Sequence, residues 1–192
     1  MDSEQCQKGI AQMSLVNPFR QLQRYLLGFL FIGTMLPRLV IGPMIIDDAY
    51  ITFRYVDNIS QGHGFVYNPD NRVLGTTTPL WTLMLAPMAF LPVDLAWSSV
   101  YLSAFFDSIS AILFFLLGIR FGLPAVGLFS GLLFAGVPQS AFFTVSGMET
   151  SLYVLLTLLS FYSSYRRKYL LSAFALAGCF LTRPDSLIVI GL

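Results

Sequence analysis

The sequence predicts an all-α membrane protein, a polytopic helical bundle of about five spans plus the start of another. Of its 192 residues, 56% are hydrophobic and only 11% are charged, whereas soluble domains carry about a quarter charged residues. A soluble fold of this length could not bury so much apolar surface, but lipid allows apolar side chains to face outward. The net charge of +1 does not favour nucleic acid, and we expect no nucleic-acid partner.

The first apolar run, Tyr25–Ile46, is long enough to cross a hydrocarbon core, which takes about 20 helical residues. A polar N-terminal arm, residues 1–24, precedes it and carries Arg20 and Arg24 next to the run. Because Lys and Arg favour the cytoplasmic side, we expect a cytoplasmic arm and a single transmembrane domain over residues 25–192. The segment after the first span then lies on the outer face.

Residues 47–78 are comparatively polar and form the first outer loop in this reading. Polar residues recur at i, i+3, i+4 and i+7 from Arg54, opposite an apolar stripe, which predicts an amphipathic helix on the membrane surface. Thr78-Pro79 is typical of a helix cap followed by proline at the first helical position. It predicts an interfacial helix over residues 79–92, too short to span, with Trp81 as its interface anchor.

Four further apolar runs follow, and a fifth begins: Leu95–Gly118, Leu123–Phe143, Met148–Tyr162, Tyr169–Leu181 and Leu187–Leu192. Counting crossings places Arg120 and Arg166-Arg167-Lys168 in the cytoplasm, as the positive-inside pattern requires. If the segment Leu80–Leu91 crossed instead, that basic cluster would lie outside. The chain ends in an apolar run, so we expect it to be the N-terminal part of a longer plasma (inner) membrane protein.

Ionisable residues near or inside the spans are the candidate functional groups. Asp47-Asp48, after the first span, could act as a general base or hold a divalent cation (Mg, Mn or Ca), or cap a helix. Glu149 begins the fourth span on the outer side, where a carboxylate also favours the helix dipole. Arg38 and Asp107 lie at similar depth in successive spans. Because isolated charges are costly in lipid, we expect these two to pair.

Three segments of the outer loop resemble the first outer loop of GT-C glycosyltransferases, polytopic enzymes that use polyprenyl-phosphate-linked sugars. They are Asp47-Asp48-Ala49-Tyr50-Ile51-Thr52-Phe53-Arg54-Tyr55, Gly62-His63-Gly64-Phe65-Val66-Tyr67-Asn68-Pro69 and Thr77-Thr78-Pro79-Leu80-Trp81. Gly147-Met148-Glu149-Thr150 and Leu181-Thr182-Arg183-Pro184-Asp185 are similar to two further features of the branch that contains arabinofuranosyltransferases and protein-mannosyltransferase-like proteins. The resemblance extends from about Ile46 to Leu187.

The resemblance implies an inverting sugar transfer on the outer (periplasmic or extracellular) face to a hydroxyl of a glycan, lipid or protein. Asp47 or Asp48 would be the catalytic base; Asp47 is favoured because it directly follows the span, and Asp48 would orient it or help bind a metal. Arg183 would hold the leaving phosphate bidentately, or else pair with Asp185. Glu149 would bind sugar hydroxyls or a cation.

Three further residues are weaker candidates for substrate binding. Arg54 and His63 lie in the outer loop, where each could reach a phosphate or sugar or be an ordinary solvated residue. Arg38 could reach up to the lipid phosphate instead of pairing. The alternative function is a non-catalytic membrane subunit, or a truncated remnant, that binds lipid-linked sugars.

Overall fold

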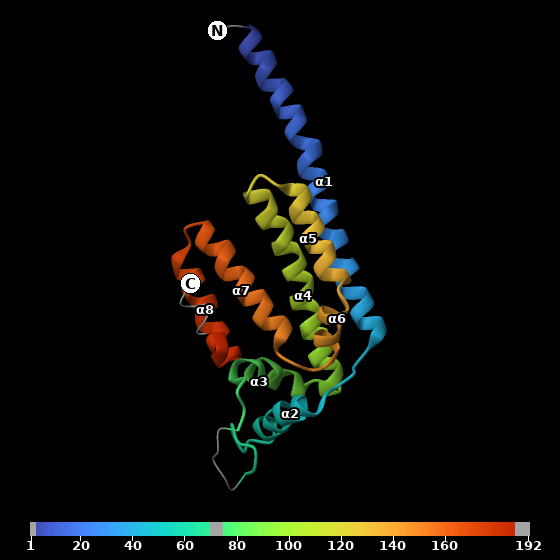
Figure 1. The fold of residues 1–192 in the computed structure, drawn as a ribbon, viewed down its shortest axis with the longest axis vertical. Coiled ribbons are helices and arrows are strands. Elements are labelled where there is room, and N and C mark those ends of the chain that lie inside the picture. Colours follow the sequence, from blue (N-terminus) through green and yellow to red (C-terminus); the bar gives the residue numbers. More distant parts are fainter. Residues whose placement is uncertain (1–2, 70–74, 187–192) are drawn as a thin grey trace.

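The computed structural model describes residues 3–69 and 75–186, and these residues form helices and connecting turns without a β-strand. The all-α fold class is therefore confirmed. Figure 1 shows the elements in chain order: α1 Ser3–Ile41, α2 Asp47–Ser60, α3 Pro79–Leu85, η1 Ala86–Phe90, α4 Leu95–Arg120, α5 Pro124–Gly136, α6 Pro138–Val145, α7 Thr150–Tyr165, α8 Tyr169–Thr182 and η2 Pro184–Ser186.

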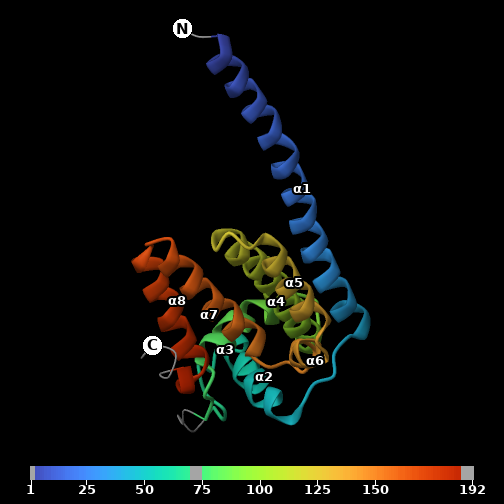
Figure 2. The ribbon, with the colours of Figure 1, turned by 45° about the horizontal axis from the view of Figure 1, so that its top comes forward.

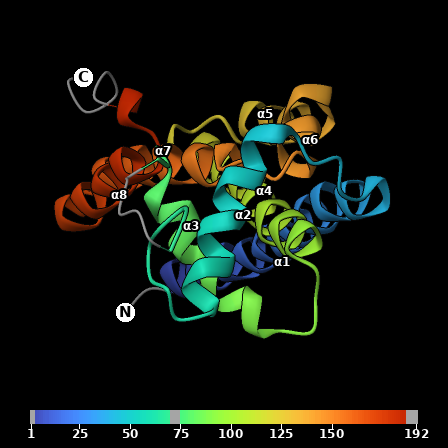
Figure 3. The same cartoon turned by 90° about the horizontal axis from the view of Figure 1, so that it is seen from below.

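Helix α4 lies at the centre of the bundle and packs against α1, α5 and α7, while α8 packs on the outer side of α7. Helices α2 and α3 lie across one end of the bundle, as the view from below shows (Figure 3). Helix α1 starts within the predicted cytoplasmic arm and extends well past the other helices (Figure 2). The fold therefore consists of a bundle and a capping layer built from the first outer loop.

Two helical segments, Arg20–Ile41 and Leu95–Arg120, are long and apolar enough to cross a membrane. The bent pair α5–α6 makes a third if it counts as one span. Helices α7 and α8 have 16 and 14 residues and so extend about 24 Å and 21 Å, less than a hydrocarbon core of about 30 Å. The count of five spans stays a prediction, and Leu187–Leu192 lies outside the described residues.

The first helix ends at Ile41, earlier than the predicted end of the first span. Gly42, at φ +74°, and Pro43 stop the helix. The chain then runs extended beside the end of α6, where the Met44 N–H donates to the Val145 carbonyl at 2.8 Å. Asp47 is therefore separated from α1 by an ordered, hydrogen-bonded connector.

The third predicted span, Leu123–Phe143, is not a continuous helix. It is divided into α5 and α6, which meet at an angle of 53°. Pro138 causes the break because it has no N–H to donate to the carbonyl of Phe134, four residues earlier. The hydroxyl of Ser140 replaces that donor and reaches the Phe134 carbonyl at 2.6 Å.

Glycines allow α5 to approach α4 closely. A Cβ on Gly118 would lie 2.3 Å from the Cα of Gly127, and one on Gly131 would lie 2.7 Å from the carbonyl oxygen of Ala111. Small residues at a helix crossing bring the two backbones into direct contact, which is a common way of packing helices in membranes.

Helix α3 begins as predicted, with Thr78 as the capping residue and Pro79 at the first helical position. The predicted role of Trp81 as an interface anchor is wrong, because its side chain is completely buried. Its indole Nε1–H donates to the carbonyl of Gly147 at 3.1 Å, and its ring packs in the core with Phe106. A buried indole needs such a partner for its N–H.

Candidate functional site

The turn between α6 and α7 holds the capping layer against the bundle. Gly147 occupies this turn at φ +82°, and a Cβ added there would lie 3.0 Å from the Cβ of Ala49 in α2. On α3, Trp81 donates to the Gly147 carbonyl. The start of α2, the start of α3 and the segment Gly147–Thr150 therefore meet at one end of the bundle (Figure 3).

A cavity of about 270 Å³ lies where these segments meet, and we call it the outer-loop cavity. It carries two carboxylates and a set of threonine hydroxyls among apolar side chains. Its lining comprises Asp48, Ile51, Thr52, Gly75, Thr76, Thr77, Thr78, Met148 and Glu149. Such a lining offers acceptors and donors suited to a ligand that carries several hydroxyl groups.

The threonine hydroxyls of this cavity are linked to one another. The hydroxyl oxygens of Thr76 and Thr78 lie 3.2 Å apart, and those of Thr52 and Thr78 lie 3.5 Å apart. The backbone N–H of Thr78 also donates to the Thr76 hydroxyl at 3.2 Å. These bonds join the wall formed by α2 to the wall that precedes α3, so the hydroxyls are held in place before a ligand arrives.

The two aspartates differ in their relation to the cavity. Asp48 lines it, whereas Asp47 is not among the lining residues. Both side chains are exposed and lie in the first turn of α2, where a negative charge favours the helix dipole. The expectation that an aspartate caps this helix is wrong, because the capping residue is Ile46 and no side chain caps the helix.

Arg183 pairs with Glu149. Its Nε donates to Glu149 Oε1 at 2.6 Å, and its Nη2 donates to the Thr150 hydroxyl at 3.1 Å. The guanidinium also lies 5.9 Å from the centre of the Tyr153 ring. The alternative pairing of Arg183 with Asp185 is therefore wrong. Glu149 is only 4% exposed, so the arginine compensates a nearly buried carboxylate at the cavity wall.

Arg54 and His63 do not line the outer-loop cavity. Both side chains are exposed, and Arg54 Nε donates to the carbonyl of Tyr67 at 3.3 Å within the loop. Nothing in their surroundings distinguishes them from ordinary loop residues, and their role in substrate binding stays a prediction.

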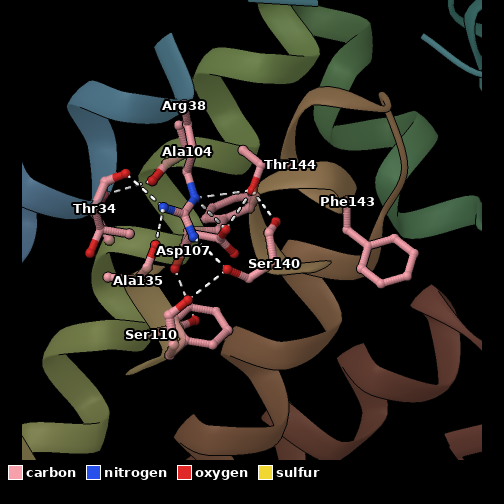
Figure 4. Close-up of polar contacts among 12 residues, drawn as sticks. Thr34, Arg38, Ala104, Asp107, Ser110, Ala135, Ser140, Phe143 and Thr144 are labelled. Carbon is pink, nitrogen blue, oxygen red and sulfur yellow. Dashed lines mark hydrogen bonds and ion pairs between the residues drawn. The ribbon is translucent and has the colours of Figure 1, made fainter. Parts of the chain in front are cut away.

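The expected ion pair between Arg38 and Asp107 is confirmed. Arg38 Nε lies 2.8 Å from Asp107 Oδ2, and both side chains are buried. Figure 4 shows the guanidinium surrounded by acceptors from α1, α4, α5 and α6. Its Nε also reaches the Thr144 hydroxyl at 3.2 Å, and Nη2 reaches the Ser140 hydroxyl at 2.7 Å.

The remaining donors of Arg38 go to backbone carbonyls. Nη1 donates to the carbonyls of Thr34 and Ala135 at 2.9 Å and 3.2 Å. The carbonyl of Ala135 lies at the end of α5, where the break before Pro138 disrupts the helical ladder. The guanidinium thus caps this break. Arg38 does not line the outer-loop cavity, and its predicted contact with a lipid phosphate has no support from this geometry.

A metal site at Asp47 and Asp48 would need ligands from outside the protein side chains. Among residues 3–69 and 75–186, no three His, Cys, Asp or Glu side chains lie close enough together to hold an ion. Calcium takes six to eight oxygen ligands and magnesium six, so substrate oxygens and water would supply the rest. The divalent cation stays a prediction.

No protein-family model, no curated protein and no solved structure matches this chain.

Replacing Gly147 by alanine should separate α2 from the bundle. The new Cβ would meet Ala49 at 3.0 Å and Ile45 at 3.1 Å while adopting a strained positive φ. The matched control is Gly64→Ala, which has the same sign of φ (+85°) but nothing within 4 Å of the new Cβ. Overpacking typically costs about 1–3 kcal/mol, so we expect Gly147→Ala to unfold more easily than the control by about that amount.

Thermal unfolding of both variants in detergent measures the difference. Equal destabilisation would show that the strained positive φ, rather than contact with α2, makes alanine unfavourable at position 147. That result would contradict the packing described above.

Proposed function

We propose that this chain is part of a membrane glycosyltransferase that moves a sugar from a polyprenyl-phosphate donor to an acceptor hydroxyl. The observation that carries the proposal is the outer-loop cavity, in which Asp48, Glu149 and three consecutive threonines, Thr76–Thr78, line one space. The segments that resemble GT-C glycosyltransferases contribute most of this lining. A site for a hydroxyl-rich ligand and a carboxylate that can accept a proton are the elements such a transfer requires.

Asp48 is the proposed general base. It removes the proton of the acceptor hydroxyl while that oxygen attacks the anomeric carbon of the donor. The bond from this carbon to the phosphate oxygen breaks, and polyprenyl phosphate leaves with the bonding electrons. A single displacement of this kind inverts the configuration at the anomeric carbon. We prefer Asp48 to Asp47 because Asp48 lines the cavity.

Glu149 and the threonines would orient the sugar, and Arg183 would offset negative charge. Arg183 is held 2.6 Å from Glu149, and its side chain is 35% exposed. In the empty site the positive charge of Arg183 is paired with the Glu149 carboxylate, so no unpaired cation remains. When the phosphate departs, the exposed part of the guanidinium would attract it. The orientation of reactants by fixed groups is a large part of the catalysis of such transfers.

The proposed topology places the outer-loop cavity outside the cell and the basic turns inside. Arg120 ends α4, and Arg166-Arg167-Lys168 joins α7 to α8. These two turns lie at the same end of the bundle, where the Tyr165 hydroxyl donates to the Arg120 carbonyl at 3.1 Å (Figure 1). The cavity lies at the opposite end. This separation agrees with the positive-inside pattern and supports a polytopic protein in the plasma (inner) membrane.

Cysteine labelling in intact cells tests this topology. In a Cys6→Ser background, with Cys179 buried, we expect a membrane-impermeant maleimide to label His63→Cys directly. Lys168→Cys should react only after the membrane is permeabilised. Labelling of Lys168→Cys in intact cells would contradict the proposed orientation.

Loss of transfer in an Asp48→Asn variant tests the proposed chemistry. Membranes containing the full-length protein are incubated with a panel of polyprenyl-phosphate-linked sugars, mannose, glucose and arabinofuranose among them, and sugar transfer or hydrolysis is measured. Removing a general base typically slows a reaction about 10²–10⁴-fold. We expect this loss in Asp48→Asn, and a smaller effect in Asp47→Asn.

Asp57→Asn is the matched control, because Asp57 lies on the same helix and does not line the cavity. It should retain the activity of the parent protein. Unchanged turnover in Asp48→Asn would rule out Asp48 as the base, and unchanged turnover in both Asp47→Asn and Asp48→Asn would rule out either aspartate. Binding of a lipid-linked sugar without any turnover would instead favour the alternative, a non-catalytic subunit or remnant.

A further inference from the structure

The turns that follow α4 and α7 lie side by side at the end of the bundle opposite the outer-loop cavity (Figure 1). The Tyr165 hydroxyl donates to the Arg120 carbonyl at 3.1 Å, and the ring centres of Phe121 and Tyr165 lie 5.0 Å apart. Each turn carries basic residues, and all of them are exposed: Arg120, Arg166, Arg167 and Lys168. We call these four residues the basic end.

Arg167 occupies a position that normally belongs to glycine. Its N–H donates to the Ser164 carbonyl at 2.8 Å, and the N–H of Lys168 donates to the Ser163 carbonyl at 2.9 Å. These two bonds form a Schellman motif, in which the residue after the helix cap takes the left-handed conformation. Arg167 has φ +56° and is the one non-glycine residue with positive φ within the described ranges. A residue with a Cβ is strained in this conformation.

The turn after α4 makes the same two hydrogen bonds with a glycine. The N–H of Gly122 donates to the Ile119 carbonyl at 3.1 Å, and the N–H of Leu123 donates to the Gly118 carbonyl at 2.8 Å, with Gly122 at φ +74°. One turn is therefore built without strain, whereas the other holds a strained arginine. Strained residues cluster at functional sites, so the strain at Arg167 points to a role for its positive charge.

Two cations of the basic end converge on one phenol hydroxyl. The side chains of Arg120 and Arg166 both interact with the hydroxyl of Tyr162. No ion pair joins any residue of the basic end to a carboxylate within the described part of the chain. Like charges that lie close together repel one another. The basic end is therefore suited to an anion that compensates several positive charges at once.

The neighbouring side chains indicate that this anion belongs to a lipid. Aromatic and apolar residues beside the cations are exposed: Phe121, Tyr165, Tyr169 and Leu170. Basic residues combined with exposed aromatic rings are typical of the membrane–water interface. In the proposed topology this end lies at the cytoplasmic leaflet, where clustered Lys and Arg bind anionic headgroups. The guanidinium fork also matches the oxygens of a phosphate.

We propose that the basic end binds the phosphate headgroup of an anionic phospholipid. Arg120 and Arg166 hold the phosphate, and Arg167 and Lys168 add positive charge beside it. The exposed aromatic rings contact the adjoining part of the acyl chains. This site lies at the opposite end of the bundle from the outer-loop cavity and does not depend on the proposed transfer reaction.

Native mass spectrometry of the full chain, purified in detergent, tests the proposal. The protein is titrated with dioleoylphosphatidylglycerol or dioleoylphosphatidylcholine, which share their acyl chains and differ in headgroup charge. We expect phosphatidylglycerol to bind more tightly, and inorganic phosphate at the same concentration not to displace it. One Lys or Arg near an anionic surface is worth about a fivefold change in affinity. Arg120→Gln and Arg166→Gln should each weaken phosphatidylglycerol binding about fivefold.

Arg167→Gly separates the role of the charge from the stability of the turn. Glycine adopts a positive φ without strain, so we expect this variant to unfold in detergent at the same temperature as the parent protein or at a higher one. It should nevertheless bind phosphatidylglycerol about fivefold more weakly. An arginine with a purely structural role would give the reverse, a lower unfolding temperature with unchanged lipid binding.

Arg167→Lys and Arg20→Gln are the matched controls. The first keeps the positive charge of the turn, and the second removes an exposed arginine of α1 that does not belong to the basic end. Both should bind phosphatidylglycerol as the parent protein does. The proposal is overturned if phosphatidylcholine binds as tightly, if inorganic phosphate displaces the lipid, if the three variants of the basic end keep the parental affinity, or if Arg20→Gln weakens binding as much as they do.

Discussion

The ion pair between Arg38 and Asp107 is the constraint on which the rest of the bundle depends. Both side chains are buried, and a single buried charge without a partner is costly, so each residue compensates the other. The guanidinium also satisfies the Ala135 carbonyl at the end of α5 and binds Ser140 and Thr144 of α6. A helix that is broken by proline among apolar residues needs such donors, because a buried carbonyl without a hydrogen bond is costly. One side chain thus fixes α1 to α4 and stabilises the break between α5 and α6.

The position of α6 in turn determines the position of the outer-loop cavity. Consecutive residues at its end contact different parts of the chain. Thr144 joins the ion-pair network, the carbonyls of Val145 and Ser146 hold the connector before α2, and the carbonyl of Gly147 accepts from Trp81. Glu149 follows directly and lines the cavity with Asp48. The carboxylates of the proposed active site are therefore placed by a chain of short contacts that starts within the bundle.

Sequence reasoning succeeded where local pattern decides the structure. The helical character of the apolar runs, the amphipathic start of the outer loop and the Thr78-Pro79 helix start all depend on neighbouring residues. Similar depth in successive runs was enough to pair Arg38 with Asp107. Sequence reasoning failed where contacts between segments far apart in the sequence determine the structure. Trp81 looked like an interface residue, but the Gly147 turn buries it. Thr52, Thr77 and Thr78 lie in segments that the sequence analysis singled out, but nothing in the sequence showed that their hydroxyls line one cavity. That Asp48 lines the cavity could have been anticipated, because Asp48, Ile51 and Thr52 share one face of a helix that begins at Asp47.

The central claim is that Arg38 and Asp107 act as one unit, and a double-mutant cycle measures this most directly. Arg38→Met, Asp107→Leu and the double variant are compared with the parent protein by unfolding in detergent. Breaking a buried pair by removing one partner typically costs about 3–5 kcal/mol, whereas replacing both by apolar residues is often far less costly. The account predicts that the double variant is more stable than either single variant. Destabilisation in the double variant equal to the sum of the two single effects would show that the residues act independently, and would contradict it.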